Sequence, residues 1–595
     1  MPSQEIGMPI PNIPHAVSVT LPTWEATVGY EEGEDWVVSK MNSGYPRFFI
    51  HSSIQKLCSN LEKKYGRDGE RCMCFPSYKV AKRCREFIKA HTVNQTSFKI
   101  RVLQLSTLEP SNDTEKSTMI GATIGVVFFP RSEYPLAKNY WQHSGEGISS
   151  RMGEYILKEL FEKDNDNNDN YNNSNGADIS KMSGNLKQEL QSLQIQSRSP
   201  SISASRASSA AGYNIDDVNR DFDSFIEQKY GRVLDLKFAN EAKAALRRRI
   251  AGKADKSTER VEELERAKRG KHLNENDVYL FPSGMASIFY AHHALLNVSD
   301  QPKKSVCFGF PYVDTLNILK KFGPGVHFLG LGDDESLDNL EEQLSQGLDI
   351  LALFCECPSN PLLKTPNLHR IRQLADKYNF AIVIDETVGN FINIHVLPYA
   401  DMVASSLTKV FSGDSNVLAG SLILNPDSKY YTILKTFFNK EYEDLFWAED
   451  ALWLERNSRD FVERVHKIDD TSAKVVELLQ NSPLISQIYY PSVSDSKKYY
   501  DVIKNEGGGY GGLISFLFKQ PQQAVKFFNA VNLHKGPSLG TNFTLACPYA
   551  ILAHYQELDE ISQWGVDRNL IRISIGLEDP TELLDVLQKS LDESI

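Results

Sequence analysis

Two short stretches of this sequence decide its fold: AIVID, from Ala381 to Asp385, and MVASSLTK, from Met402 to Lys409. Each is an apolar run that ends in polar residues, which is typical of a strand buried on both faces of a parallel sheet. Ligands of such sheets bind at the carboxyl ends of the strands, and Asp385 and Lys409 both fall there. The sequence therefore predicts that a carboxylate and an amine meet at one edge of a sheet.

The same alternation of strands and helices extends outward from these two strands. Between residues 276 and 466, short apolar runs alternate with amphipathic segments such as LHRIRQLADKYNF, at residues 368–380. This pattern predicts a large α/β domain with a mostly parallel sheet. From about residue 467 we expect a smaller α/β domain, with GGLISFLF (residues 511–518) and IRISIG (residues 571–576) as strands.

A polar segment of low complexity separates this region from the N-terminal part of the chain. Residues 163–212 are rich in Asn, Asp and Ser and have almost no apolar periodicity. Such a segment buries too little surface to offset its ordering entropy, so we expect a disordered linker, either phosphorylated at its serines or an inert spacer. We therefore expect five segments: an N-terminal extension module of unknown role (1–162), the linker (163–212), a helical arm (213–275), a large domain (276–466) and a small domain (467–595).

The N-terminal module has the pattern of a folded domain without a catalytic cluster. Residues 98–105 and 121–130 are predicted strands, and the apolar spacing of residues 80–91 predicts a helix. The aromatic run at residues 45–49 is interpreted as core. We therefore expect residues 1–212 to be unnecessary for the chemistry of the protein.

Composition excludes several classes of partner and compartment. The net charge of −12 argues against nucleic acid or an anionic membrane as the main partner, and no apolar run approaches the length of a membrane helix. The eight cysteines and the absence of a secretion signal indicate reduced thiols and a protein of the cytoplasm, or of the cytoplasm and nucleus. Cys72, Cys74 and Cys84 do not have the spacing of a common zinc module, so we expect no metal.

The lysine and aspartate at the sheet edge have the residue types that pyridoxal 5'-phosphate (PLP) chemistry requires. Lys409 can form a Schiff base with the cofactor, the hydroxyls of Ser406 and Thr408 can bind its phosphate, and Asp385 can keep its ring nitrogen protonated. Taken singly, a lysine after a strand is usually a surface residue and an aspartate there is often a helix cap. In combination they predict a PLP-dependent enzyme.

Two further segments fit such a site, although each has a simpler interpretation. Gly284 and Met285 lie between a predicted strand and a predicted helix, where backbone N–H groups favour a phosphate; the preceding Ser283 is equally an ordinary N-cap. Asn360 lies in the turn at residues 358–361 and can direct its amide at a cofactor hydroxyl, or it is simply a turn residue.

Six segments, in this order, resemble the cystathionine γ-synthase/lyase family of transsulfuration enzymes: FPSGMAS, CPSNPLL, IDETVGN, SSLTKVFSG, SLGTNFTLACP and RISIGLED. The resemblance runs from Tyr230 to the C-terminus, and the N-terminal extension resembles the fungal branch of the family. It implies the type I fold of PLP-dependent transferases, as in aspartate aminotransferase.

The resemblance also implies a role for each matching residue. Lys409 would carry the cofactor and Asp385 would contact its ring nitrogen. The other implied positions are Tyr312 as a catalytic residue stacked on the ring, Gly284, Met285, Ser406 and Thr408 at the phosphate, Tyr230 and Arg232 reaching the phosphate of a neighbouring subunit, and Arg572 with Ser538 at the substrate α-carboxylate.

Four departures from the family pattern leave substrate preference open. Glu386 replaces an asparagine after the aspartate, and Gly413-Asp414 replaces a glycine-histidine pair after the lysine. Residues 455–457 (Glu-Arg-Asn) replace an apolar-arginine-glycine stretch, and the glycine pair after Tyr312 is missing.

The activity implied by the resemblance is PLP-dependent γ-replacement. An O-acylhomoserine, either succinyl or acetyl, would react with cysteine to give cystathionine in methionine biosynthesis, in a homodimer or homotetramer. Alternatives are a cystathionine γ-lyase, an O-acetylhomoserine sulfhydrylase or a non-catalytic regulatory paralogue.

Overall fold

The computed structural model describes residues 5–46, 48–93, 99–162, 235–253 and 269–595. Residues 1–154 and 234–595 form one compact unit, and residues 155–233 form a second one, of which the described part, 155–162, is helical. The predicted linker and residues 213–234 of the predicted arm lie outside the described residues. The described part of the arm contains the helix α11 (Ala239–Ile250).

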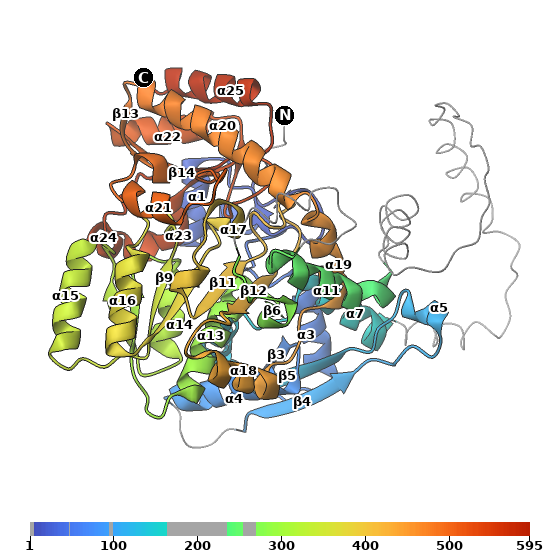
Figure 1. The fold of residues 1–595 in the computed structure, drawn as a ribbon. Helices are drawn as coiled ribbons and strands as arrows, with labels where there is room; N and C mark the ends of the chain where they lie inside the picture. Colours follow the sequence, from blue (N-terminus) through green and yellow to red (C-terminus); the bar gives the residue numbers. More distant parts are fainter. Residues whose placement is uncertain (1–4, 47, 94–98, 163–234, 254–268) are drawn as a thin grey trace, which may run out of the picture. The chain divides into compact units, whose positions relative to one another are not determined.

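A seven-stranded sheet in the order β6-β12-β11-β10-β9-β7-β8 forms the large domain (Figure 1). Its strands are β6 (Val278–Phe281), β7 (Ser305–Phe308), β8 (Val326–Leu329), β9 (Ala352–Glu356), β10 (Ala381–Asp385), β11 (Met402–Ser406) and β12 (Gly420–Leu424). Only β12 pairs antiparallel with its neighbours in this sheet. The expected mostly parallel sheet is confirmed.

Helices cover both faces of this sheet, which is why its strands are apolar throughout. Along β10, Ile382 and Ile384 belong to one buried core, whereas Ala381 and Val383 belong to another. The first core contains residues of α11, α15 (Asp334–Ser345) and α16 (Leu368–Tyr378). The second contains residues of α13 (Gly284–Val298), α14 (Val313–Lys321) and α18 (Tyr431–Glu441).

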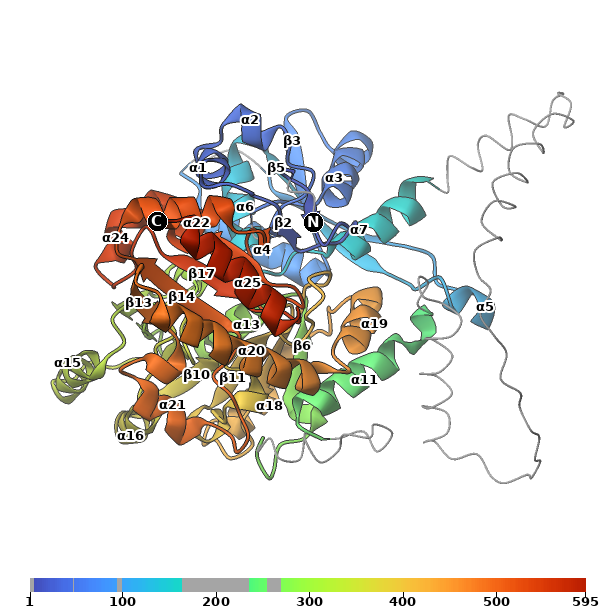
Figure 2. The ribbon, with the colours of Figure 1, turned by 90° about the horizontal axis from the view of Figure 1, so that it is seen from above.

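The small domain follows α19 (Ala448–Asn457) and begins with the long helix α20 (Phe461–Asn481), which spans the boundary expected at residue 467. Its five-stranded sheet has the order β13-β14-β17-β16-β15. The strands are β13 (Ile485–Tyr489), β14 (Leu513–Phe518), β15 (His534–Lys535), β16 (Leu545–Pro548) and β17 (Ile571–Ser574), so the two expected strands are present as β14 and β17. Figure 2 shows α20, α22 (Pro521–Ala530) and α25 (Pro580–Asp592) beside this sheet, and they share one buried core with it.

The N-terminal residues contain their own antiparallel sheet, in the order β3-β5-β4. The strands are β3 (Glu70–Phe75), β4 (Arg101–Ser106) and β5 (Thr123–Pro130), with helices α3 (Ser52–Tyr65), α4 (Tyr78–His91) and α6 (Tyr134–Ser144). The predicted helix at residues 80–91 is α4, and its Val80, Cys84 and Ile88 side chains are fully buried. The two predicted strands correspond to β4 and β5.

This N-terminal part packs tightly against the rest of its unit. The Tyr140 ring centroid lies 5.8 Å from that of Phe322 and 6.4 Å from that of Phe289. Leu21 joins a core with residues of the small domain, and its backbone N–H donates to the Lys535 carbonyl at 2.9 Å. The N-terminal residues therefore contribute to the stability of the unit, although the sequence predicts residues 1–212 to be unnecessary for the chemistry.

The described residues offer neither a membrane span nor a metal site. None of their helices has both the length and the apolarity that a membrane span requires. They contain no group of three or more His, Cys, Asp or Glu side chains placed to hold a metal ion. All eight cysteines are free thiols.

A chain that begins at Tyr213 is expected to lose stability and turnover. Removing residues 1–212 uncovers apolar side chains such as Phe322 and Phe289, and loss of large buried aromatic contacts costs about 3–5 kcal/mol per site. The measurement is the thermal unfolding midpoint together with the soluble yield.

A chain lacking only residues 170–205, within the predicted linker, is the matched control and should keep both properties. A stable, fully active protein starting at Tyr213 would contradict this prediction.

Candidate active site

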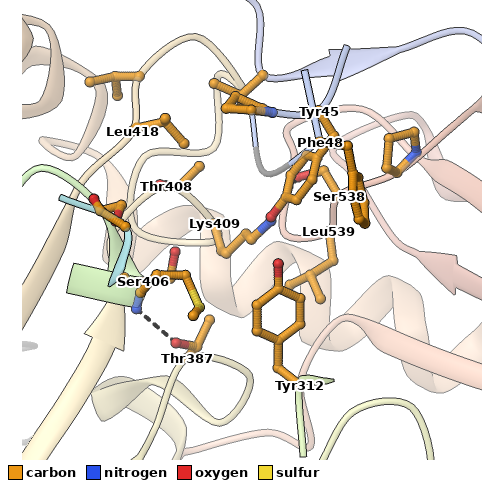
Figure 3. Close-up of a pocket in the computed structure, with 18 of the residues that line it drawn as sticks. Tyr45, Phe48, Tyr312, Thr387, Ser406, Thr408, Lys409, Leu418, Ser538 and Leu539 are labelled. Atoms are coloured by element: carbon orange, nitrogen blue, oxygen red, sulfur yellow. Dashed lines mark hydrogen bonds between the residues drawn. The ribbon is translucent and has the colours of Figure 1, made fainter. Parts of the chain in front are cut away.

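A cavity of about 220 Å³ lies at the carboxyl ends of β9, β10 and β11 (Figure 3). Every described residue that the sequence assigned to the site lines it: Gly284, Met285, Tyr312, Asn360, Asp385, Ser406, Thr408, Lys409, Ser538 and Arg572. Tyr230 and Arg232, which the family resemblance places at the phosphate, lie outside the described residues. The fold therefore brings together residues that are almost 300 positions apart in the sequence.

Lys409 lies in the turn that follows β11 and is only 8% exposed. Its Nζ donates to the Tyr45 hydroxyl and to Ser538 Oγ, both at 3.0 Å. Figure 3 shows Tyr312 on the other side of the amine, with its hydroxyl directed toward it. The amine is thus held at the cavity by hydroxyl groups.

Two carboxyl groups, the buried Glu356 and the partly buried Asp385, end neighbouring strands at this edge. Asp385 and Glu356 are directly paired in the register of β10 and β9. Burial raises the pKa of Asp385 to about 6, although hydrogen bonds from Thr387 oppose the shift. Burial and the nearby Asp385 raise the pKa of Glu356 to about 8. Glu356 accepts hydrogen bonds from the backbone N–H groups of Tyr312 and Asn360, so it organises two site segments that the sequence did not connect.

The N-terminus of α13 lines one part of the cavity. Ser283 is its N-cap, since its Oγ accepts from the Ala286 N–H at 3.1 Å, and it also donates to the Gly145 carbonyl at 2.9 Å. A Cβ at Gly284 would lie 2.6 Å from the Ser406 Cβ, so only glycine lets Ser406 approach the helix end. The free N–H groups and the dipole of a helix N-terminus favour a phosphate there.

Thr408 lines the same cavity but uses its hydroxyl mainly for the backbone. Its Oγ1 donates to the Ala419 carbonyl at 3.3 Å and accepts from the Ala419 N–H at 3.0 Å. Thr408 thereby fixes the turn that carries Lys409.

Arg572, on β17, brings the small domain to the cavity. Its Nη1 donates to Asn360 Oδ1 at 3.0 Å and its Nη2 donates to the Ser538 carbonyl at 2.7 Å. The guanidinium also lies 4.8 Å from the centroid of the Tyr549 ring. Ser538 has a positive φ of 101°, a conformation that costs energy in any residue except glycine. The side-chain hydroxyl of this strained residue contacts Lys409, and its carbonyl contacts Arg572.

The departures from the family pattern at residues 386, 413–414 and 455–457 lie outside the lining of this cavity. Glu386 forms a buried, two-pronged ion pair with Arg269, with N–O distances of 2.6 and 2.8 Å. Glu455 accepts from Arg249 at 2.9 Å, which ties α19 to α11. Asp414 accepts from Asn542 at 2.6 Å. These substitutions therefore serve packing between segments rather than contact with a ligand.

Sequence reasoning missed the part of the wall that comes from the N-terminal residues. The run at residues 45–49 was interpreted as core, whereas Tyr45 bonds to Lys409 and lines the cavity with Phe48. Gly145 packs on the α13 N-terminus, where a Cβ would lie 2.5 Å from the Met285 Cβ. No local pattern marks these residues, because their partners are more than 100 positions away.

Three groups that line this cavity fit three parts of PLP. The α13 N-terminus with Ser406 matches a phosphate, and the Lys409 amine matches an aldehyde. Asp385 matches a protonated ring nitrogen, since no lysine or arginine in the described part of the chain forms an ion pair with it.

The raised pKa values of Asp385 and Glu356 predict a pH-dependent stability of the cofactor-free protein. Above pH 4.5 the unfolded chain releases these protons, whereas the folded chain keeps them until about pH 6 and about pH 8. The folded state then binds more protons, so the free energy of unfolding falls as pH rises through this window. The part due to Asp385 is roughly 3 kcal/mol at most.

Thermal unfolding of the wild-type chain and of Asp385→Asn between pH 5 and 8 measures this effect. Between pH 5 and pH 8, the unfolding midpoint of the variant is expected to fall by less than that of the wild type. Asp376→Asn, whose side chain is 62% exposed, is the control and should behave like the wild type. Equal losses in the wild type and Asp385→Asn would contradict the prediction.

Comparison with known proteins covers both parts of the chain. Residues 233–592 match the family described as Cys/Met metabolism PLP-dependent enzyme, and residues 53–149 match the fungal trans-sulfuration enzyme N-terminal domain. The chain is 46% identical to a cystathionine gamma-synthase of Saccharomyces cerevisiae, over 100% of both chains.

Two further fungal relatives match over nearly their whole length. The chain is 45% identical to a cystathionine gamma-synthase of Neurospora crassa, covering 99% of this chain and 98% of the relative. It is 39% identical to a cystathionine gamma-synthase-like enzyme of Amanita muscaria, covering 98% and 96%. The chain therefore belongs to the Cys/Met metabolism family of PLP-dependent enzymes, in the group that carries the fungal trans-sulfuration N-terminal domain.

Proposed function

We propose that this enzyme joins an O-acyl-L-homoserine to L-cysteine and releases the acyl group, so that its product is L-cystathionine. The observation that carries the proposal is the similarity to fungal cystathionine gamma-synthases at up to 46% identity over the whole chain, the N-terminal domain included. The cavity supports it, because its amine, carboxylate and guanidinium suit an amino-acid substrate.

PLP, when bound, supplies a conjugated ring that withdraws electrons from the substrate carbons next to its amino group. Asp385, when ionised, holds a proton on the ring nitrogen and so maintains this withdrawal. Gly284 and Ser406, which approach each other closely at the α13 N-terminus, would hold the phosphate there. Lys409 carries the cofactor between turnovers.

Lys409 is also the base of the reaction. Its Nζ, when free, would move protons from Cα and then at Cβ of the substrate. Ser538 Oγ, at 3.0 Å, keeps the freed amine in the cavity. The Tyr312 hydroxyl is directed toward the same amine (Figure 3), and by family resemblance its ring would stack on that of the cofactor.

Arg572 binds the α-carboxylate of the substrate. Its guanidinium is 5% exposed and is oriented by Asn360 and the Ser538 carbonyl. A planar guanidinium held in this way suits a carboxylate, because the two groups form parallel charge-assisted hydrogen bonds. The substrate Cα is thereby placed beside Lys409.

Product analysis tests the proposed reaction. The purified enzyme with PLP is incubated with O-acetyl- or O-succinylhomoserine plus cysteine, and separately with cystathionine alone. We expect cystathionine to form at least about tenfold faster than it is cleaved, and Lys409→Ala to abolish both reactions.

The same assay distinguishes the alternatives. Faster release of cysteine from cystathionine would identify a γ-lyase. Preference for sulfide over cysteine would identify a sulfhydrylase, and no turnover with bound PLP would indicate a non-catalytic paralogue.

The working unit in this proposal is a homodimer or homotetramer with shared active sites. By family resemblance, Tyr230 and Arg232 reach the phosphate of the neighbouring subunit. A guanidinium beside a buried phosphate is worth more than a surface ion pair, so Arg232→Ala should weaken PLP retention.

Mixing Arg232→Ala with Lys409→Ala under conditions of subunit exchange tests the shared site. Half of the dimers in an equal mixture are mixed, and each holds one intact site, so recovery should approach roughly a quarter of wild-type activity. A fully active monomer, or no recovery despite proven exchange, would contradict this prediction.

A further inference from the structure

Tyr45 reaches the reacting amine from outside the PLP-dependent fold. Its hydroxyl accepts from Lys409 Nζ at 3.0 Å, and the same Nζ lies 4.8 Å from the centroid of its ring. Residues 53–149 match the N-terminal family domain, so Tyr45 lies in the segment that leads into that domain. Figure 3 shows Tyr45 and Ser538 around the end of Lys409.

We infer that Tyr45 is a catalytic residue, supplied by the N-terminal segment, that holds the Lys409 amine in place while it carries and releases protons. The inference rests on Lys409 being the lysine that carries the cofactor, as proposed above. It assigns a catalytic contribution to a part of the chain that lies outside the PLP-dependent family match.

The surroundings of Lys409 leave hydroxyl groups as its hydrogen-bonding partners. The amine is buried, and in the described ranges no carboxylate forms an ion pair with it; its hydrogen bonds go to Tyr45 and Ser538. A buried amine without such partners would be destabilised by the loss of its hydration. The two hydroxyls therefore account for its position at the cavity.

A phenol suits a group whose protonation changes during turnover. The ammonium form of lysine donates to the phenol oxygen, and the neutral amine accepts from the phenol O–H, so one contact survives both states. In water a phenol and an alkyl ammonium lose their protons at similar pH, about 10 and about 10.4. Neither state of the amine therefore forces the hydroxyl to turn away.

A local turn presents Tyr45 to the cavity. The backbone N–H groups of Phe48 and Phe49 donate to the Tyr45 carbonyl at 2.9 and 3.1 Å. Gly44 allows this turn, since a Cβ there would lie 2.4 Å from the Phe49 Cβ. The tyrosine is thus placed by backbone bonds within its own segment.

The N-terminal segment also forms hydrogen bonds with the loops that carry Lys409 and Ser538. Val17 N–H donates to the Ser415 carbonyl at 2.8 Å, beyond Lys409 in the same loop. Ser18 Oγ donates to the Pro537 carbonyl, next to Ser538. Both loops are therefore fixed relative to the segment that carries Tyr45.

Tyr45→Phe tests the inference, because it removes the hydroxyl and keeps the ring. In the cofactor-free protein, competitive acetylation with peptide mapping gives the reactivity of Lys409 as a function of pH. We expect its midpoint to shift by about 0.5 pH unit or more. In the PLP-loaded enzyme we expect kcat to fall about 10- to 100-fold, with KM changing less than about threefold.

Two controls separate a catalytic contact from a packing contact. Tyr78→Phe, at a side chain of the same domain that is 39% exposed, should leave both measurements unchanged. Incorporation of 3-fluorotyrosine at position 45 keeps the shape and lowers the phenol pKa, so it should move the pH–rate profile even if Tyr45→Phe does not fold.

Two results with Tyr45→Phe would overturn the inference. A Tyr45→Phe enzyme with wild-type kcat and an unshifted Lys409 profile, or one that loses only thermal stability, overturns the inference. Borohydride reduction with peptide mapping reports separately whether PLP is attached to Lys409. A label on another lysine would overturn the proposed function, whereas the acetylation profile would still report on the contact itself.

Discussion

The parallel register of β9, β10 and β11 is the constraint on which the rest of this site depends. Asp385 pairs with Glu356 on one side and with Ala404 on the other, so these strands end at the same edge of the sheet. Ser406 ends β11 there, and the turn that follows brings Lys409 to the same edge. A slip of one residue would turn Asp385 to the other face of the sheet and separate the carboxylate from the amine.

The buried ion pairs of the protein differ from the ionisable groups of the cavity in their partners. Arg269 with Glu386 and Arg151 with Asp450 are buried but paired, so they hold segments together without needing a ligand. Lys409 is buried and Asp385 is partly buried, yet neither forms an ion pair among the described residues. Buried charges without partners destabilise a fold, and they persist where a bound molecule supplies the missing charge. PLP would supply a protonated ring nitrogen for Asp385 and an aldehyde for the Lys409 amine.

The N-terminal part of the chain supplies one wall of this cavity. The Gly145 carbonyl accepts from Ser283 at the start of α13, and Tyr45 contacts Lys409 at the other end of the site. A wall that comes from the same chain lets the N-terminal residues contact Lys409 directly. It also explains why the N-terminal domain shares apolar cores with the rest of the unit instead of forming a separate module.

The sequence alone determined the class of fold and most of the site. Continuous apolar strands at residues 381–385 and 402–406 predicted the parallel sheet, because a strand covered on both faces has no polar side. The chemistry of a lysine, an aspartate and small hydroxyls predicted PLP, and family motifs placed Arg572 and Ser538, which the structure brings to the same cavity. These features depend on residues near one another in sequence or on segments with a strong pattern of their own.

Only the tertiary structure decided what surrounds these groups. Tyr45 and Gly145 reach the cavity from segments whose local pattern resembles ordinary core, and Glu356 became part of the site only through strand pairing. Glu386 looked like a change in the site, yet a single buried contact with Arg269 makes it a packing residue. Contacts between residues more than 100 positions apart depend on how the domains dock, and docking leaves no periodic signal in the sequence because it uses the shape of whole surfaces.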